Sequence, residues 1–307
     1  MPQAAAQWPL TIMEKMLSKK TTLAFFLVPG LAVFLGMFIF PVIYTAVLST
    51  TDWEGVGSLN FVGIDNYVKL FTKDTVFWLS VKNTFVILGV ALVGQLVPAF
   101  VLALLLHHFT RGVRIFRNAF FVPVLLSAAA IALLWQKIYD PNYGVLNELF
   151  TSLKLYFLDK DWLTDKETVL IAVIVPVVWQ WIGYHMIIMY AGLKSIPGQY
   201  AEAAKIDGAT GVQVVFKVTI PLMRDIIKIC VVLAAIGSLK IFDNIYLMTG
   251  GGPYNLTSTV AIQMYKESFL KLQFGYGSSI AISLMAICIL AFFLINKLMT
   301  RKEPIEF

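Results

Sequence analysis

The side chains that could do chemistry in this sequence are few, and most of them lie inside long apolar stretches. One group combines tryptophan and tyrosine rings with an amide, and another places a lysine, an aspartate and an asparagine within five residues. Rings and hydrogen-bonding side chains together suit a pocket for a polar, ring-shaped ligand. The candidates from these groups and from two further apolar stretches are Gln95, Ser127, Trp179, Gln180, Tyr184, Lys240, Asp243 and Asn244.

Each candidate also has a structural interpretation, namely packing or hydrogen bonding between helices. Lys240 and Asp243 are three residues apart, so on a helix they share a face and could offset each other's charge. An isolated lysine or aspartate at the centre of a membrane helix costs about 2.5 to 3.5 kcal/mol on insertion scales, so pairing alone would explain both. Contact with a substrate and coupling to ion movement are the alternatives. His185 is predicted to be a hydrogen-bonded core histidine.

Catalysis of a covalent step is not expected, because no nucleophile, general base and orienting group occur together. The sequence lacks a Gly-x-x-x-x-Gly-Lys-Ser/Thr loop, so we expect this chain to bind neither ATP nor another cofactor itself. Cys230 and Cys288 lie inside apolar stretches without metal or redox spacing, which predicts inert packing residues and no metal site. No basic face with interleaved aromatic residues suggests a nucleic-acid partner.

The bulk composition places these residues in a membrane. Hydrophobic residues make up 59% of the 307 residues and charged residues 14%, a balance that exceeds what one soluble core contains. A bilayer core about 30 Å thick needs roughly 20 apolar residues in each crossing helix. Six such stretches occur, at residues 23–48, 84–106, 116–136, 169–192, 226–247 and 278–296. The sequence therefore predicts an all-α membrane protein with six spanning helices.

The distribution of basic residues predicts the orientation. Lysine and arginine are more frequent in the segments that lie inside if the N-terminus is cytoplasmic, and inner loops are the basic ones in membrane proteins. We therefore expect a cytoplasmic N-terminal segment at 1–22, a transmembrane domain at 23–296 and a cytoplasmic tail at 297–307. The long connection at 193–224 then also lies on the inner side.

This connection, residues 193–224, is longer than a simple turn requires. Gln199 to Asp207 is rich in alanine and predicts a short helix, which the glycines from Gly208 onward interrupt. A second short helix is predicted after this break, and Pro221 is expected to stop it. The result would be a helix-turn-helix on the inner membrane surface, whose single acid Glu202 could enter a groove on a partner.

The spacing within this connection resembles the signature of the inner-membrane permeases of binding-protein-dependent ABC importers, in particular the maltose-permease-like sugar group. That signature is Glu-Ala-Ala, three residues, Gly, nine residues, Ile, one residue, Leu-Pro, and only Val218 and Ile220 depart from it in side chain. The resemblance implies that this segment couples the permease to an ATPase. The residues to which it assigns that role are Glu202, Ala203, Ala204, Asp207, Gly208, Val218, Ile220 and Pro221.

Further likenesses to the same family lie at residues 61–67, at 116–118 and in the turn at 248–253, so the resemblance covers roughly residues 61–296. It implies the six-helix type I importer fold in the inner membrane of a bacterium or archaeon. It also implies a second permease subunit, which could be identical or different, two ATPase subunits holding ATP and magnesium, and an extracytoplasmic binding protein. The transported solute would be a sugar or oligosaccharide.

Other functions remain open from the residues alone. Import of glycerol phosphate or another polyol belongs to the same family group. A secondary transporter driven by protons or sodium would use Lys240 or Asp243, because titrating groups near the membrane centre couple ion movement to transport. A passive channel would leave the long inner connection without a purpose.

Overall fold

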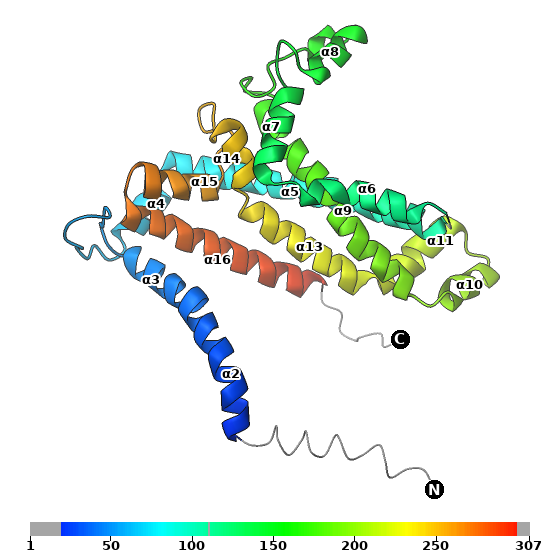
Figure 1. Ribbon diagram of the computed structural model, residues 1–307, viewed down its shortest axis with the longest axis horizontal. Helices are drawn as coiled ribbons and strands as arrows, with labels where there is room; N and C mark the ends of the chain where they lie inside the picture. The colour runs from blue at the N-terminus through cyan, green and yellow to red at the C-terminus, as the bar shows by residue number, and fades with distance from the viewer. Residues whose placement is uncertain (1–19, 110, 300–307) are drawn as a thin grey trace.

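The computed structural model describes residues 20–109 and 111–299, which form helices and connecting loops without a β-sheet (Figure 1). The predicted terminal segments 1–22 and 297–307 lie mostly outside these residues. The first half of the described chain contains α2 (Lys20–Phe34), η1 (Leu35–Ile39), α3 (Phe40–Leu48), α4 (Asp65–Thr72), α5 (Thr75–His108), α6 (Val113–Leu125), α7 (Ala128–Ile138), α8 (Val145–Ser152) and η2 (Tyr156–Leu158). The second half contains α9 (Val169–Ser195), α10 (Gln199–Ile206), α11 (Gly211–Val214), η3 (Val215–Thr219), α12 (Ile220–Leu222), α13 (Arg224–Leu239), α14 (Asp243–Thr249), α15 (Val260–Tyr265), η4 (Lys266–Leu270) and α16 (Phe274–Met299).

Four of the predicted spans are long, apolar helices, namely Thr21–Leu48, Thr75–His108, Val169–Ser195 and Phe274–Met299. All six predicted apolar stretches are helical, so the all-α membrane class is confirmed. The two remaining stretches are not single straight helices, however. The stretch at 116–136 and the stretch at 226–247 are each divided into two helices.

The predicted third span is bent by 98° between α6 and α7. Leu126 and Ser127 have extended backbone angles, and the Ser127 hydroxyl accepts a hydrogen bond of 3.2 Å from the Ala130 amide. Ser127 therefore caps the start of α7, a position that serine favours. Pro123 precedes the break, where its ring weakens the end of α6. The predicted third span is therefore two helices joined at a sharp bend.

The predicted fifth span is broken at Lys240, Ile241 and Phe242, between α13 and α14. The Thr259 hydroxyl donates a hydrogen bond of 2.9 Å to the Ile241 carbonyl, and the Phe242 ring stacks on Tyr246 with centroids 4.9 Å apart. The hydrogen bond gives the freed backbone carbonyl a partner, and the rings cover the interrupted backbone. Polar backbone groups inside a membrane require such partners. Periodicity over 226–247 predicts a continuous helix because such partners from another segment are not visible in the local sequence.

The interior of the bundle is built around α5 and α9, which run side by side in Figure 1. Ala99 and Ala103, both fully buried on α5, form a core cluster with Met186 and Met189 of α9. Small alanine side chains allow the helix backbones to approach, and the flexible methionines fill the remaining space. This rigid pair holds the elements that carry the candidate site.

The N-terminal span projects away from this bundle. Figure 1 shows α2 extending from α3, and only α3 packs against α16. Large apolar side chains such as Phe25 and Phe26 are exposed along this span. An apolar helix without protein around it is stable in a hydrocarbon environment, which agrees with the predicted membrane location.

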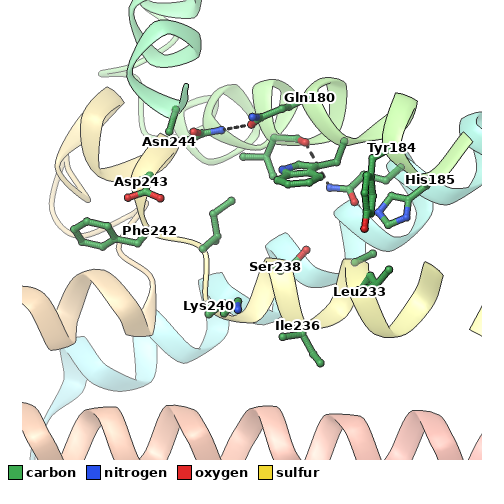
Figure 2. A pocket seen from close by; sticks show the side chains of 17 residues that line it. Gln180, Tyr184, His185, Leu233, Ile236, Ser238, Lys240, Phe242, Asp243 and Asn244 are labelled. Carbon is green, nitrogen blue, oxygen red and sulfur yellow. Dashed lines mark hydrogen bonds between the residues drawn. The ribbon is translucent and has the colours of Figure 1, made fainter. Parts of the chain in front are cut away.

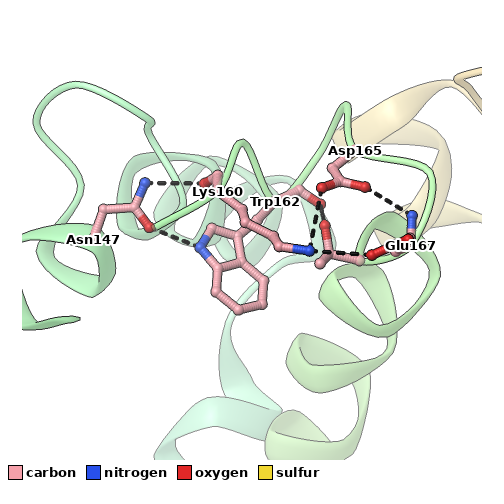
Figure 3. A network of polar contacts seen from close by, with 6 residues as sticks. Asn147, Lys160, Trp162, Asp165 and Glu167 are labelled. Atoms are coloured by element: carbon pink, nitrogen blue, oxygen red, sulfur yellow. Dashed lines mark hydrogen bonds and ion pairs between the residues drawn. The ribbon is translucent and has the colours of Figure 1, made fainter. Parts of the chain in front are cut away.

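The segment between α7 and α9 forms a compact lobe held by polar contacts (Figure 3). Asn147 donates to the Lys160 carbonyl at 3.0 Å and accepts from the Trp162 indole at 2.8 Å. The Lys160 ammonium lies 3.2 Å from Glu167 and 3.6 Å from Asp165. The hydrogen bond to Glu167, and then the charge of Asp165, raise the pKa of Lys160. This lobe is a folded element on the side of the bundle from which α7 projects (Figure 1).

Candidate functional site

A cavity of about 760 Å³ lies between α9, α13 and α14, with further contributions from α5 and α7. Figure 2 shows Gln180, Tyr184 and His185 of α9 facing Ser238 and Lys240 across it. The break between α13 and α14 forms one wall, because Phe242, Asp243 and Asn244 follow it directly. Interrupted helices that line a cavity are a recurrent way to build a site within a membrane domain.

Six of the eight predicted substrate-path residues line this cavity. They come from α5, α9, the break and α14, so the fold joins positions up to 149 residues apart in the sequence. The six are Gln95, Gln180, Tyr184, Lys240, Asp243 and Asn244. The remaining two, Ser127 and Trp179, do not line it.

The positions of these two residues have local causes. Ser127 caps α7 through its contact with the Ala130 amide at 3.2 Å. Trp179 packs edge-on against Trp135 of α7, with ring centroids 5.8 Å apart, and thereby joins α9 to α7. The tryptophan that does line the cavity is Trp181, two positions further along α9.

Amide side chains form a polar wall in the cavity. The Asn244 amide donates a buried hydrogen bond of 2.8 Å to the Gln180 carbonyl oxygen (Figure 2). Gln95 donates a longer one, 3.5 Å, to the Val177 carbonyl. A side-chain amide has two donor hydrogens and an acceptor oxygen, so each of these side chains can keep its hydrogen bond within the protein and still form another with a ligand. The wall is thus both fixed in position and able to form further hydrogen bonds.

Aromatic rings lie beside this polar wall on α9. Trp181 and Tyr184 meet edge to face with centroids 5.7 Å apart, and Tyr184 meets His185 at 5.4 Å. These residues are three and one positions apart, which places Trp181, Tyr184 and His185 around one side of the helix. That spacing was a usable signal in the sequence, and Trp181 and His185 could have been predicted from it. Phe242 adds a further ring at the break.

The prediction for His185 is wrong in one respect. The residue is buried, with 2% of its surface exposed, but its Nδ1 atom has no hydrogen-bond partner within the described residues. Because a buried polar atom without a partner costs free energy, His185 is not the satisfied core histidine that its apolar surroundings suggested. Its ring lines the cavity instead.

The two charged residues of the cavity do not pair. Lys240 follows the last residue of α13 and Asp243 begins α14, so they do not share a helical face, and both side chains are exposed. In the described part of the chain the ion pairs involve Lys160 and Lys271. The prediction that Lys240 and Asp243 offset each other on one helix is therefore wrong. Each is free to interact with whatever enters the cavity.

The arrangement supports binding of a polar ligand. It offers a cation, a carboxylate, several amides and aromatic rings on walls that are fixed by packing. Residues 20–109 and 111–299 contain no group of three or more histidine, cysteine and acidic side chains that could hold a metal ion.

The second candidate site is the connection that contains the signature residues. α10 matches the predicted first helix. Glu202 is exposed on it, and Asp207 is exposed directly after its last residue. Gly208 has a φ of +82° that favours glycine. Thr210 then starts the next helix with a capping box, in which the Thr210 hydroxyl and the Gln213 side chain bond each other's backbone amides. The turn between the two helices is thus specified locally.

The second helix of this connection does not stop at Pro221 as predicted, because α11, η3 and α12 continue to Leu222. η3 is a turn of π-helix in which the Ile220 amide bonds the Val215 carbonyl. This wider turn places Pro221 in the first positions of α12, where its missing N–H removes no intrahelical bond. The first span uses the same arrangement, with η1 directly before Pro41.

Exposed apolar residues surround the signature positions. Ile206 is 87% exposed, and Val212 and Phe216 are 69% and 66% exposed. Together with the exposed acids they form a mixed surface of the kind that docks against another protein. These residues stand between the signature positions, and nothing in the local sequence pattern distinguishes them from lipid-facing residues.

Comparison with known proteins places this geometry in a family. Residues 79–303 match the family of binding-protein-dependent transport system inner membrane components. A probable ABC transporter permease of Pyrococcus horikoshii is 39% identical over 262 residues, which cover 85% of this chain and 89% of that protein. The permease of a diacetylchitobiose uptake system of Streptomyces coelicolor is 32% identical and covers 97% of this chain and 88% of that protein.

The fold also matches a solved structure. A chain from a bacterial ABC transporter involved in the import of the acidic polysaccharide alginate superimposes with a TM-score of 0.82. The match covers 95% of this chain and 99% of that chain at 21% sequence identity, so it establishes a shared architecture.

Proposed function

The chain belongs to the family of inner membrane components of binding-protein-dependent transport systems, and we propose that it carries a sugar or oligosaccharide through the membrane in such a system. Members of this family are permease subunits of ABC importers, and that role applies to this chain. The single observation that supports a sugar is the composition of the cavity between α9, α13 and α14.

A sugar presents hydroxyl groups at its rim and C–H groups on its faces, and the cavity offers partners for both. Gln180 and Asn244 supply oriented donors and acceptors for hydroxyl groups. Trp181 and Tyr184 supply aromatic surface for the apolar face of a ring. The relative from Streptomyces coelicolor is named for the uptake of diacetylchitobiose, which is consistent with such a ligand.

We also propose that the energy for transport comes from outside this chain. In this proposal two ATPase subunits bind ATP and magnesium, and this chain binds no cofactor. The coupling surface is the exposed face of the 193–224 connection, which carries Glu202 and Ile206. A second, similar permease would complete the passage. Closure of the ATPases would push this connection, and the helices that it joins, α9 and α13, would transmit the movement to the cavity.

The proposed orientation places both termini and the 193–224 connection in the cytoplasm. Basic residues favour this side, as the inner loops of membrane proteins do. The lobe between α7 and α9 would then face the binding protein on the outer side. This orientation gives the permease one face for the energy source and another for the delivered solute.

A second candidate substrate is a glycerol phosphate or another charged polyol. The observation that favours it is Lys240, which lies in the cavity lining without a carboxylate partner among the described residues. Coupling to an ion gradient is not proposed, because the family to which the chain belongs depends on a binding protein.

Replacement of Trp181 by leucine tests the sugar proposal. In proteoliposomes containing the assembled transporter and its binding protein, we expect ATP-dependent uptake of the preferred sugar to fall about tenfold, because the aromatic surface is lost. The assay would use a labelled panel that includes diacetylchitobiose, other disaccharides and glycerol 3-phosphate. Uptake of glycerol 3-phosphate alone would replace the sugar proposal by the second candidate.

Trp179→Leu is the matched control. Trp179 contacts Trp135 outside the cavity, so this variant should lose thermal stability and keep the uptake rate of each assembled complex. If the wild type and the Trp181 variant take up the sugar at equal rates, the cavity is not part of the transport path.

A further inference from the structure

A second cavity, of about 520 Å³, lies among α4, the start of α5, η4 and the start of α16. Its charged lining residues are Lys69, Lys73, Lys266, Lys271, Asp74 and Glu267. The substrate cavity shares none of these residues. We refer to this second cavity as the lysine pocket.

The two carboxylates of the lysine pocket are already occupied. Glu267 is buried, bonds the Lys271 ammonium at 2.7 Å and accepts a hydrogen bond of 2.8 Å from Gln263. Asp74 accepts hydrogen bonds from the Tyr276 hydroxyl at 2.6 Å and from the Phe77 amide at 2.8 Å. The lining therefore carries four lysines against two carboxylates, an excess of two positive charges.

Three cations thus have no carboxylate within 4.0 Å in the part of the chain that the structure describes. Lys69 lies over the Tyr276 ring, 4.2 Å from its centroid, and Lys266 donates to the Asn255 amide oxygen at 3.3 Å. Burial, and then the charge of Lys271, lower the pKa of Lys266. With Lys73 at the end of α4, the pocket presents excess positive charge that an anion would stabilise.

The pocket lies at the end of the bundle opposite the 193–224 connection. α5 starts at the pocket with Thr75 and ends at His108, and 34 helical residues extend about 50 Å. α16 also starts beside the pocket. Its far end reaches the connection, since the Arg224 guanidinium donates to the Met299 carbonyl at 3.0 Å. If the connection faces the ATPases, the pocket faces the outside.

We propose that the lysine pocket receives a carboxylate side chain from the surface of the extracytoplasmic binding protein. The proposal rests on the proposed function for the orientation of the chain in the membrane. The binding protein must dock at the outer end of the bundle, and a pocket there with four lysines and two carboxylates suits an acidic side chain. A lipid headgroup is less well suited, because Lys266 is half-buried in the cavity wall and bonded to Asn255.

The test measures ATPase activity of the assembled transporter against the concentration of its binding protein, in nanodiscs of neutral lipid and of lipid containing phosphatidylglycerol. We expect the double variant Lys69→Glu, Lys73→Glu to need about tenfold more binding protein for half-maximal stimulation. The activity without binding protein should stay unchanged, and the salt dependence of stimulation should weaken. The control is Lys82→Glu, because Lys82 is exposed on α5 outside the pocket.

If the double variant does not assemble, the single variant Lys73→Gln replaces it in the test. We expect a smaller increase in the binding-protein concentration needed for half-maximal stimulation. If the variants reach half-maximal ATPase stimulation at the same concentration of binding protein as the wild type, the lysine pocket is not a docking site. An effect restricted to nanodiscs with phosphatidylglycerol would also overturn it, in favour of a lipid headgroup. If the binding protein does not stimulate the ATPase activity of the wild-type transporter, the proposed function itself is contradicted. This result differs from a failure of the lysine pocket, in which the wild type and the variants are stimulated alike.

Discussion

At the scale of single residues, close approach of helices depends on the absence of a side chain at particular positions. Gly183 lies in the middle of α9, where the helix meets α6, and a Cβ at this position would overlap the Phe120 carbonyl. Backbone atoms cannot move aside as a flexible side chain does, so alanine does not fit there without separation of the helices. Gly183 also adjoins Tyr184 and Trp181, whose position in the cavity depends on this contact.

Gly183→Ala is therefore expected to lower the stability of the purified permease by about 1 to 3 kcal/mol, because the clash forces α9 away from α6. A thermal unfolding curve in detergent measures this as a lower Tm. The matched control is Gly89→Ala on α5, where nothing lies within 4 Å of a new Cβ. That variant should keep or raise the Tm, since alanine is the better helix former. An unchanged Tm for the Gly183 variant would show that α6 moves aside without cost.

At the scale of elements, the shape of the cavity depends on where helices are interrupted. The break between α13 and α14 exposes Lys240 and Asp243 to the cavity, and the bend between α6 and α7 directs the chain toward the lobe between α7 and α9 (Figure 1). In the 193–224 connection, the π-turn η3 lets the second helix continue through Pro221. α10 and the following helix therefore form a unit joined to α13, which is suited to transmit a push from outside the chain.

Glu202→Lys tests the coupling role of α10. The side chain is exposed, so membrane insertion and basal stability should stay unchanged, whereas uptake and binding-protein-stimulated ATPase activity should fall about tenfold or more, because a charge at the docking surface is reversed. The matched control is Asp225→Lys. Asp225 is an exposed acid in the first turn of α13 and is not one of the signature residues. Equal losses in the two variants would indicate a general charge effect and contradict a specific role for Glu202.

At the scale of the whole molecule, the two ends of the bundle differ in what they expose. The 193–224 end exposes Ile206 and Phe216 beside acids, and the other end carries the lysine pocket and the folded lobe held by Asn147 and Lys160. The cavity lined by α9, α13 and α14 lies between them. This order is consistent with the proposed function, in which a solute arrives on one side and energy on the other.

The orientation of the molecule can be measured with single cysteines. In a chain carrying Cys230→Ala and Cys288→Ala, we would introduce either Tyr143→Cys in the lobe or Ile206→Cys in α10, since both residues are almost fully exposed. A membrane-impermeant maleimide should label position 143 in intact cells and position 206 in inverted vesicles, because inner loops are the basic ones. Labelling of position 206 in intact cells would reverse the proposed orientation.

The membrane class, the six apolar helical stretches and the α10 helix with its turn at Gly208 could all be predicted from the sequence. These features depend on local properties, namely the length of apolar runs, helix propensity and the backbone freedom of glycine. The substrate-path candidates Gln180, Tyr184 and Asn244 were also recognisable, because polar and aromatic groups are rare within apolar spans. Their functional roles remain predictions.

Which of these residues lie together depends on contacts between segments that are distant in the sequence. Contacts from distant segments, such as Thr259 with Ile241, stabilise the break that separates Lys240 from Asp243 and turns both toward the cavity. The choice of Trp181 over Trp179 as the cavity residue depends on which side of α9 faces α7. Local patterns do not contain this information, since the backbone partners and packing surfaces come from residues far away in the chain.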